Sequence, residues 1–388
     1  MKKIIVLILL LLISVLLIVS CGESTAVTTK GASSESSALP VHTTCGGLAT
    51  SPDATTTTAK PSDLTTTDKN DTTALPVTTT KAPVITTTPK VTTTKKAPQT
   101  TVPETTAAPI TYTAKSWMGA LPDATFLNDI AMPGTHDSGA TKDYILAGTA
   151  KCQSLSIAEQ LALGVRFFDI RLRRVDGELH VYHGYVDQEL SFDEVLSACY
   201  AFLAENPSEA LMMCIKEEYD ASGTNGAFDA MVSAKIKENA AYWQTTPAVP
   251  TLGAVRGKIV LMRRYSTSGS FGINASSGWR DNATFTLNTG SSTLSVQDYY
   301  NNESADAKWA AVTAMFPKMQ YKKNVYYLNY TSGYKAGMLD IPNINTIKDS
   351  VNPKLIEYLK TAPDFVGVVV VDFVTDEIAS LIYEVNFK

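Results

Sequence analysis

The sequence predicts a parallel α/β domain over residues 113–388, built either as a βα barrel or as a doubly wound sheet. Short apolar segments alternate with amphipathic segments throughout this region, which is the pattern of strands and covering helices. The nucleotide-binding patterns GxGxxG and GxxxxGK[ST] are absent from the sequence. Their absence weakens the doubly wound hypothesis, because those sheets commonly bind nucleotides through such loops.

Residues 1–21 are predicted to be an export signal. Two lysines follow the initiator Met and precede an unbroken apolar run at 4–20, the order of charge and apolar residues that such signals use. The run ends in Ile-Val-Ser-Cys-Gly, which is similar to a bacterial lipoprotein signal and marks Cys21 as the lipidation site. An uncleaved membrane anchor is the alternative, because the run is close to the shortest length that spans a bilayer. Both interpretations place the rest of the chain outside the cytoplasm, on the cell membrane or cell surface, or shed from it.

Residues 22–112 are predicted to be a disordered tether. The segment consists mainly of Thr, Ala, Pro, Ser and Lys, with near-repeats such as PVTTTK and VTTTKK. It has almost no aromatic side chains, so it cannot bury a core. Its acidic and basic residues balance, and as a flexible coil it would span on the order of 50 Å. We expect it to hold the folded domain away from a membrane.

Within 113–388 the elements alternate in type. The predicted strands are 126–132, 165–173, 179–184, 210–219, 258–265, 325–332 and 365–374, and the predicted helices are 156–164, 192–207, 228–243 and 352–362. Leu196, Tyr200 and Leu203 fall on one helical face. Gly164 and Pro207 end the first two helices.

Charge and cysteine content exclude several classes of function. The domain carries seven more acidic than basic side chains, so it lacks the basic footprint of a nucleic-acid-binding protein. Its three cysteines, Cys152, Cys199 and Cys214, show no CxxC or Cys/His metal spacing. We expect them to be buried free thiols, and we expect the protein to be a monomer.

Ionisable residues cluster where the predicted strands end. In a βα barrel these ends form one face, and catalytic groups project from it. Asp372 is the clearest case, because it follows the apolar run VGVVVV, and a carboxylate delivered by a buried strand needs a partner. The groups at strand ends are His136 and Asp137, Asp169 and Arg171, His183, Lys216 and Glu218, Arg264, and Asp372.

Two histidines with carboxylates to orient them are suited to paired acid and base catalysis. Arg171 adds a permanent cation that can bind a phosphate oxygen. The sequence contains neither GxSxG nor HExxH. These residue types favour phosphodiester cleavage by an internal hydroxyl. The competing interpretation is a structural His-Asp turn together with scattered ion pairs.

The domain resembles the bacterial phosphatidylinositol-specific phospholipases C over nearly all of 113–388. The motifs that carry the resemblance are MPGTHDSGA, GVRFFDIRLR, VYHG, ENPSEALMMCIKEEY, RGKIVLMRRYS, VQDYY and VVVVDFV. They occur in the family's order and at compatible spacing, and the set is far more specific than any single member. The resemblance implies an imperfect (βα)8 barrel.

The resemblance also implies roles for individual residues. His136 would be the general base that takes the proton of the inositol 2-hydroxyl, and Asp372 would orient it. His183 would be the general acid for the diacylglycerol oxygen, with support from Asp137. Arg171 would stabilise the phosphate and would be positioned by Asp169. The products would be diacylglycerol and inositol 1,2-cyclic phosphate, and slow hydrolysis of the cyclic ester would follow.

The inositol ring would be bound by four further residues, Lys216, Arg264, Asp298 and Tyr300, the last by stacking. Because Arg171 is a cation at the phosphate, where calcium-dependent relatives place acidic ligands, we expect catalysis without a metal or other cofactor. The substrate would be phosphatidylinositol, free in a membrane or as part of a glycosyl-phosphatidylinositol (GPI) anchor. Glu218 is either a network partner or a charge at a helix entry, and His180 is expected to be structural.

Alternatives stay open for the way the protein contacts a membrane and for its function. Family members present tryptophans at the active-site rim, whereas the matching segments 142–150 and 331–340 have none and offer Tyr144, Ile145, Leu146 and Tyr334 instead. The rival functions are another barrel phosphodiesterase (a glycerophosphodiester phosphodiesterase or a calcium-dependent phospholipase C) and an inactive surface-binding module.

Overall fold

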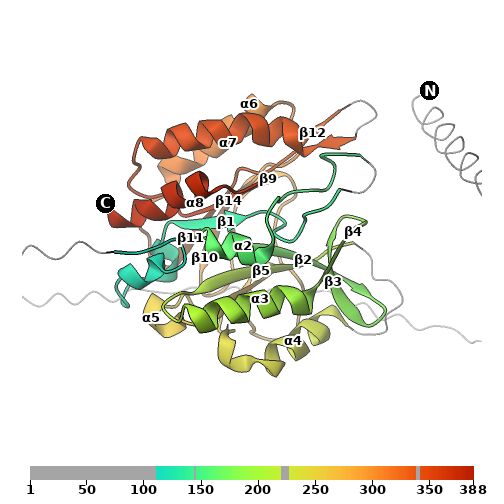
Figure 1. The fold of residues 1–388 in the computed structure, drawn as a ribbon, viewed down its shortest axis with the longest axis vertical. Coiled ribbons are helices and arrows are strands. Elements are labelled where there is room, and N and C mark those ends of the chain that lie inside the picture. The colour runs from blue at the N-terminus through green and yellow to red at the C-terminus, as the bar shows by residue number, and fades with distance from the viewer. Residues whose placement is uncertain (1–110, 144–145, 220–226, 338–340) are drawn as a thin grey trace, which may run out of the picture. The chain divides into compact units, whose positions relative to one another are not determined.

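The computed structural model describes residues 111–143, 146–219, 227–337 and 341–388 (Figure 1). The predicted signal, the predicted lipidation site Cys21 and nearly all of the predicted tether lie outside the described residues. Within the described part, no helix is both long enough and apolar enough to cross a membrane.

A curled, mostly parallel sheet forms the centre of the domain. Its strands follow the order β6-β7-β5-β2-β1-β14-β11-β10-β9, with β8 beside β7. Neighbours along this path run parallel, except that β9 is antiparallel to β10. The bounds are β1 Met132–Thr135, β2 Phe167–Val175, β5 Leu211–Glu217, β6 Trp243–Gln244, β7 Ile259–Arg263, β8 Ile273–Asn274, β9 Ala283–Asn288, β10 Thr293–Asp298, β11 Val325–Tyr330 and β14 Val368–Val371. Among the described residues β6 does not pair with β9, so the barrel stays open there. The predicted imperfect βα barrel is confirmed.

Helices cover the outside of the sheet. In Figure 1, α6, α7 and α8 lie on one side of it and α3 and α4 on the other. Among the described residues the helices are α2 Ile157–Ala162, α3 Phe192–Glu205, α4 Phe228–Glu238, α5 Leu252–Val255, α6 Ala305–Met315, α7 Ile344–Lys360 and α8 Asp376–Tyr383. The 3₁₀ segments of the same part of the chain are Trp117–Ala120, Leu127–Asp129, Ala240–Tyr242, Phe316–Lys318 and Glu384–Phe387. Capping boxes formed by Ser156 with Glu159 and by Ser191 with Glu194 begin α2 and α3.

The strands divide the core into two layers because successive side chains point to opposite faces. In β14, Val368 and Val370 belong to the apolar cluster inside the barrel. Val369 and Val371 belong to the cluster between the sheet and the helices. All four are buried, which confirms the predicted burial of this strand on both faces and explains why its sequence is continuously apolar.

Some predicted elements differ from the structure. The predicted strand 126–132 is wrong: Leu127–Asp129 is a 3₁₀ turn and the strand is Met132–Thr135. The Asn128 amide explains the turn, because it donates to the carbonyls of Lys322 and Val325. The predicted helix 352–362 begins earlier, at Ile344, and tolerates Pro353 inside it. Strands β9 and β10 and helices α6 and α8 are not among the predicted elements.

The strand that carries His183 is not one of the strands that form the barrel wall. β3 (Glu178–His183) pairs antiparallel with β2 and with β4 (Val186–Ser191), so the three form an extension beyond the end of β2. A separate two-stranded sheet, β12 (Lys335–Ala336) with β13 (Pro342–Asn343), stands nearby in Figure 1. Both extensions lie at the end of the barrel where the parallel strands finish.

The opposite end of the barrel is closed by a buried ion pair. Arg166, which precedes β2, donates to Glu209 Oε2 through Nε (3.0 Å) and Nη2 (2.8 Å), and neither side chain is exposed. Arg166 also donates to the Ala114 carbonyl, and Glu209 accepts from the backbone N–H of Gly119. The pair therefore fastens the first described residues to the barrel. Nearby, the ring of Tyr112 stacks on that of Phe387 at a centroid distance of 4.1 Å.

Candidate active site

A pocket of about 430 Å³ opens at the barrel end where the parallel strands finish. Its lining residues are His136, Arg171, His183, Lys216, Glu218, Arg264, Ala275, Ser276, Trp279, Arg280, Asp281, Asp298, Tyr300, Gly333, Tyr334, Ile344 and Asp372. Eight of the predicted catalytic and substrate-binding residues are therefore brought together. The other two, Asp137 and Asp169, lie fully buried beside Arg171.

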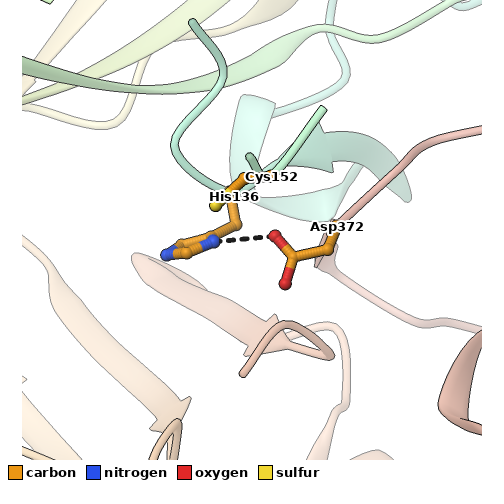
Figure 2. Close-up of side chains that lie close together, drawn as sticks. All are labelled: His136, Cys152 and Asp372. Carbon is orange, nitrogen blue, oxygen red and sulfur yellow. Dashed lines mark hydrogen bonds and ion pairs between the residues drawn. The ribbon is translucent and has the colours of Figure 1, made fainter. Parts of the chain in front are cut away.

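His136 is held between a carboxylate and a guanidinium. It follows β1, and its Nδ1 lies 2.8 Å from Asp372 Oδ1 at the end of β14 (Figure 2). On the other side of the ring, Arg171 Nη2 lies 2.7 Å from Nε2. Because a guanidinium can only donate, Nε2 must be the acceptor and Nδ1 must carry the proton given to Asp372. This tautomer leaves a basic nitrogen facing the pocket.

Gln153 fixes the backbone around this pair. Its side-chain N–H groups donate to the carbonyls of His136 and Val371, each at 2.9 Å, and its Oε1 accepts from the Val374 N–H. One amide therefore ties the ends of β1 and β14 together. Sequence reasoning missed this residue, since nothing in the local sequence distinguishes it from a surface amide.

Arg171 is the centre of the charge network. Its Nε and Nη2 donate to Asp169 Oδ2 at 3.3 and 3.2 Å, and Nη1 lies 3.7 Å from Asp137 Oδ2. Burial opposes ionisation of Asp169, but the cations of Arg171 and Arg264 outweigh it and lower its pKa to about 2. Burial dominates at Asp137 and raises its pKa to about 7, although Arg171 acts in the other direction. The guanidinium is thus fixed by an ionised carboxylate while part of its donor capacity faces the pocket.

His183 faces His136 across the pocket, with the two ring centroids 6.4 Å apart. Its Nδ1 makes a 2.6 Å hydrogen bond to the Ala150 carbonyl. The expected partner Asp137 lies 4.0 Å away, too far for a hydrogen bond, so it acts on the ring only through its charge. The hydrogen bond that orients the His183 ring is made by the Ala150 backbone carbonyl instead. A backbone acceptor could not have been identified from residue types.

The pKa of His183 should be measurably low. Burial disfavours the charged ring, and the Arg171 cation adds to this effect, so the pKa lies below the ordinary value of 6.5. We expect NMR of the ring protons to show a titration midpoint below 6.5. Arg171→Gln should move this midpoint upward, because it removes a cation that opposes protonation. An unchanged midpoint in that variant would show that Arg171 does not control the acid.

The remaining predicted residues line the rest of the pocket. Lys216 Nζ donates to Glu218 Oε2 at 2.5 Å, and Glu218 Oε1 accepts from the Gly184 N–H. Burial opposes ionisation of Glu218, but Arg171 and Lys216 outweigh it and lower its pKa to about 2. Glu218 is therefore a partner in the network, and it joins β5 to the turn that follows His183. His180, by contrast, pairs with Glu178 at 3.2 Å.

An aromatic wall completes the pocket, and its Trp279 was not predicted from the sequence. The Arg264 guanidinium stands 3.9 Å from the centre of the Trp279 ring, and Trp279 Nε1 donates to Asp298 Oδ2 at 3.0 Å. Tyr300 donates its hydroxyl to Asp281 at 2.5 Å. A single tryptophan in a loop rich in glycine and serine could have been noticed as a candidate.

Of the proposed rim residues, Leu146 is 49% exposed and Tyr334 lines the pocket, and Tyr144 and Ile145 lie outside the described residues.

Lys308 supports this wall from behind. It comes from α6, is fully buried, and donates to the Tyr299 carbonyl (2.8 Å) and to Gln297 Oε1 (3.3 Å). Tyr299 lies between Asp298 and Tyr300, so the lysine fixes the backbone that carries both. Burial lowers the pKa of Lys308 to about 7, against the opposing charges of Asp298 and Asp372.

We expect Lys308→Met to raise KM for an inositol lipid about tenfold with little change in kcat, which corresponds to losing about one hydrogen bond from a charged donor. Steady-state kinetics measure the two constants separately. Lys318→Met, which replaces an exposed lysine, is the matched control and should change neither. A loss confined to kcat would contradict a positioning role for Lys308.

The fold and the pocket define a barrel enzyme of the class that acts on phosphodiesters. The family model for the phosphatidylinositol-specific phospholipase C X domain matches residues 131–265. The 1-phosphatidylinositol phosphodiesterase of Staphylococcus aureus strain Newman is 32% identical over 262 residues, which is 63% of this chain and 83% of the relative. The enzyme of that name from Listeria monocytogenes is 28% identical over 271 residues, 67% of this chain and 81% of the relative.

Solved structures agree with this assignment. A phosphatidylinositol-specific phospholipase C from Staphylococcus aureus matches with a TM-score of 0.64 and 31% identity, covering 70% of this chain and 97% of the other. The Listeria monocytogenes enzyme matches with a TM-score of 0.58 and 26% identity, covering 71% and 99%. The chain belongs to the phosphatidylinositol-specific phospholipase C family.

Proposed function

We propose that this protein cleaves the phosphodiester of phosphatidylinositol to diacylglycerol and inositol 1,2-cyclic phosphate. One observation carries the proposal: the unprotonated Nε2 of His136, the Arg171 guanidinium and the His183 ring all face one pocket. Base, phosphate-binding cation and acid are therefore within reach of a single substrate. Family membership supports the same substrate, since the relatives are named for it.

The contacts suggest the order of events. When the substrate phosphate enters, Arg171 donates to its oxygens and releases Nε2 of His136. Nε2 then takes the proton of the inositol 2-hydroxyl, and the oxygen attacks phosphorus. The bond from phosphorus to the diacylglycerol oxygen breaks as His183 delivers its proton to that oxygen. Asp372 stabilises the imidazolium that forms on His136, at the 2.8 Å contact. Reversal of the two roles hydrolyses the cyclic ester.

Recognition of the headgroup is assigned to the other residues that line the pocket. Lys216, Arg264 and Asp298 offer donors and acceptors for ring hydroxyls, and Tyr300 offers a face for stacking. This headgroup chemistry is common to free phosphatidylinositol and to the GPI anchor, and parallel assays with a lipid vesicle and with a GPI-linked protein distinguish them. Because the Arg171 cation occupies the phosphate position, we propose that catalysis needs no metal.

Phosphorus NMR of the reaction on phosphatidylinositol tests the activity. We expect a cyclic phosphodiester signal that is undiminished in EDTA. A requirement for calcium would favour a calcium-dependent phospholipase C, and release of glycerol phosphate would favour a glycerophosphodiester phosphodiesterase. An absence of any product would favour an inactive binding module, which the retention of His136, Asp137, Asp169, Arg171, His183 and Asp372 argues against.

We further propose that the chain acts as a monomer outside the cytoplasm, anchored to the membrane through a lipid on Cys21 and held off it by the tether at 22–112. The export-type sequence before Cys21 supports this. Membrane fractionation of the wild type and of Cys21→Ala tests it. The variant should leave the membrane fraction, and equal retention of both forms would indicate a different anchor.

A further inference from the structure

Three potential metal ligands lie together beside the pocket: His183, which is the acid of the proposed reaction, and its neighbours Asp137 and Cys152. The carboxylate of Asp137, Sγ of Cys152 and Nδ1 of His183 offer one atom each within 4.8 Å of one another. Asp137 and Cys152 are both fully buried. Asp137 comes from the turn after β1, Cys152 from the loop before α2 and His183 from the end of β3, so the fold and not local sequence assembles the group.

The Asp137 carboxylate is incompletely satisfied in this position. Among the described residues neither of its oxygens has a hydrogen-bond partner. Its nearest charged neighbours are Arg171 Nη1 at 3.7 Å and His183 Nδ1 at 4.0 Å. A buried carboxylate without hydrogen bonds is costly, so this site favours a ligand that binds to oxygen.

A second set that includes Cys152 is less suitable. His136, Cys152 and Asp372 also lie within 4.8 Å of one another, and Figure 2 shows the Cys152 sulfur beside the His136 ring. There, however, the nitrogen and oxygen that would bind the ion already share a 2.8 Å hydrogen bond. A cation would have to break that bond. In the set with Asp137 the carboxylate oxygens have no hydrogen bond to lose, and the one bond that a cation breaks is that of His183 Nδ1 to the Ala150 carbonyl.

The distances fit a small tetrahedral ion. Zinc bonds of about 2.3 Å to sulfur and about 2.0 Å to nitrogen or oxygen place tetrahedral ligands about 3.3–3.6 Å apart. The observed separations from His183 Nδ1 are 3.8 Å to Cys152 Sγ and 4.0 Å to Asp137 Oδ2. Each of these two separations would close by a few tenths of an ångström, and the third pair, Cys152 Sγ and the Asp137 carboxylate, lies within 4.8 Å. A carboxylate and a thiolate together neutralise a divalent cation, and the thiolate selects zinc over calcium or magnesium.

We propose that Asp137, Cys152 and His183 form an inhibitory site for Zn²⁺ or a similar thiophilic divalent cation. On binding, the Cys152 thiol loses its proton to solvent, and the proton on His183 Nδ1 is replaced by one on Nε2. The ring gives up its hydrogen bond to the Ala150 carbonyl. A ring bound to the ion through Nδ1 can no longer take up a second proton, so it cannot serve as the acid. The inhibition rests on the proposed function, in which His183 is the acid. Binding of the ion is independent of that function.

Cobalt absorption tests the site independently of activity. The full-length protein is titrated with Co²⁺, which should produce a near-ultraviolet charge-transfer band from thiolate to metal and the visible bands of a tetrahedral ion. Cys152→Ser should abolish the charge-transfer band. Cys199→Ala, which removes another buried thiol, should keep it, and both variants retain Cys21 and Cys45.

Inhibition is measured in parallel, on phosphatidylinositol vesicles with increasing Zn²⁺. We expect the concentration for half-inhibition to rise at least about 100-fold in Cys152→Ser, because losing a ligand should cost no less than losing an outer-shell partner, which costs about 10–100-fold, and to stay the same in Cys199→Ala. A band that persists in Cys152→Ser, or no band in the wild type, would overturn the proposal. A cobalt band in a protein with no lipase activity would refute the proposed function and leave the metal site standing.

Discussion

His136→Ala is expected to lower kcat on phosphatidylinositol about 10²–10⁴-fold, the usual contribution of a general base. The variant removes the nitrogen that accepts from Arg171 and breaks the 2.8 Å contact with Asp372. Binding of the inositol headgroup should change less than kcat, because the variant leaves Lys216 and Arg264 in the pocket lining. Release of cyclic phosphodiester, followed by phosphorus NMR, measures the loss.

His180→Ala is the matched control for this variant. His180 pairs with Glu178 at the strand surface and does not line the pocket. Its replacement should leave kcat within twofold of the wild type, which is about 0.4 kcal/mol of barrier. If the two variants lost activity equally, His136 would not be the base, and a fold-wide effect would explain both.

Glu209→Gln is expected to have the largest effect on stability, a loss of about 3–5 kcal/mol in the free energy of unfolding. Breaking a buried ion pair leaves an uncompensated buried charge, which has a cost of this size. Here the charge is that of Arg166, which is fully buried and donates two hydrogen bonds to one oxygen of Glu209. Urea denaturation followed by circular dichroism measures the difference.

An exposed ion pair provides the comparison. Asp123 pairs with Arg256 at 2.6 Å, and its side chain is 76% exposed. Asp123→Asn should therefore change the free energy of unfolding by no more than about 1 kcal/mol. Equal losses in the two variants would mean that burial does not set the strength of these pairs in this protein.

The sequence was most informative where strands are buried. The run before Asp372 is apolar at every position because β14 is covered on both faces. The groups that follow such strands were therefore predicted to lie together, and seven of them line one pocket. The roles assigned to those residues came from family resemblance, and the experiments above are what would test them.

Other features could not be predicted, and the physical reasons differ. Strands β9 and β10 alternate apolar and polar residues within a stretch rich in Thr, Ser and Asn, so they lack a continuous apolar signal. The predicted helix began at residue 352, yet α7 begins after the Asn343 cap and continues through Pro353. The acceptor for His183 is a backbone carbonyl, and any residue type supplies one. Trp279 joins the site through a loop, whose path depends on tertiary contacts.

The stacked rings of Tyr112 and Phe387 have a consequence for engineering the chain. Their 4.1 Å separation places the first and last parts of the described domain side by side, at the barrel end away from the pocket. A linker of a few residues could join them. New termini could then be opened at Gly290, in the turn between β9 and β10, where nothing lies within 4 Å of an added Cβ. The segments of the barrel could then be synthesised in a different order and still assemble into the same fold. The domain is therefore a suitable starting point for circular permutation.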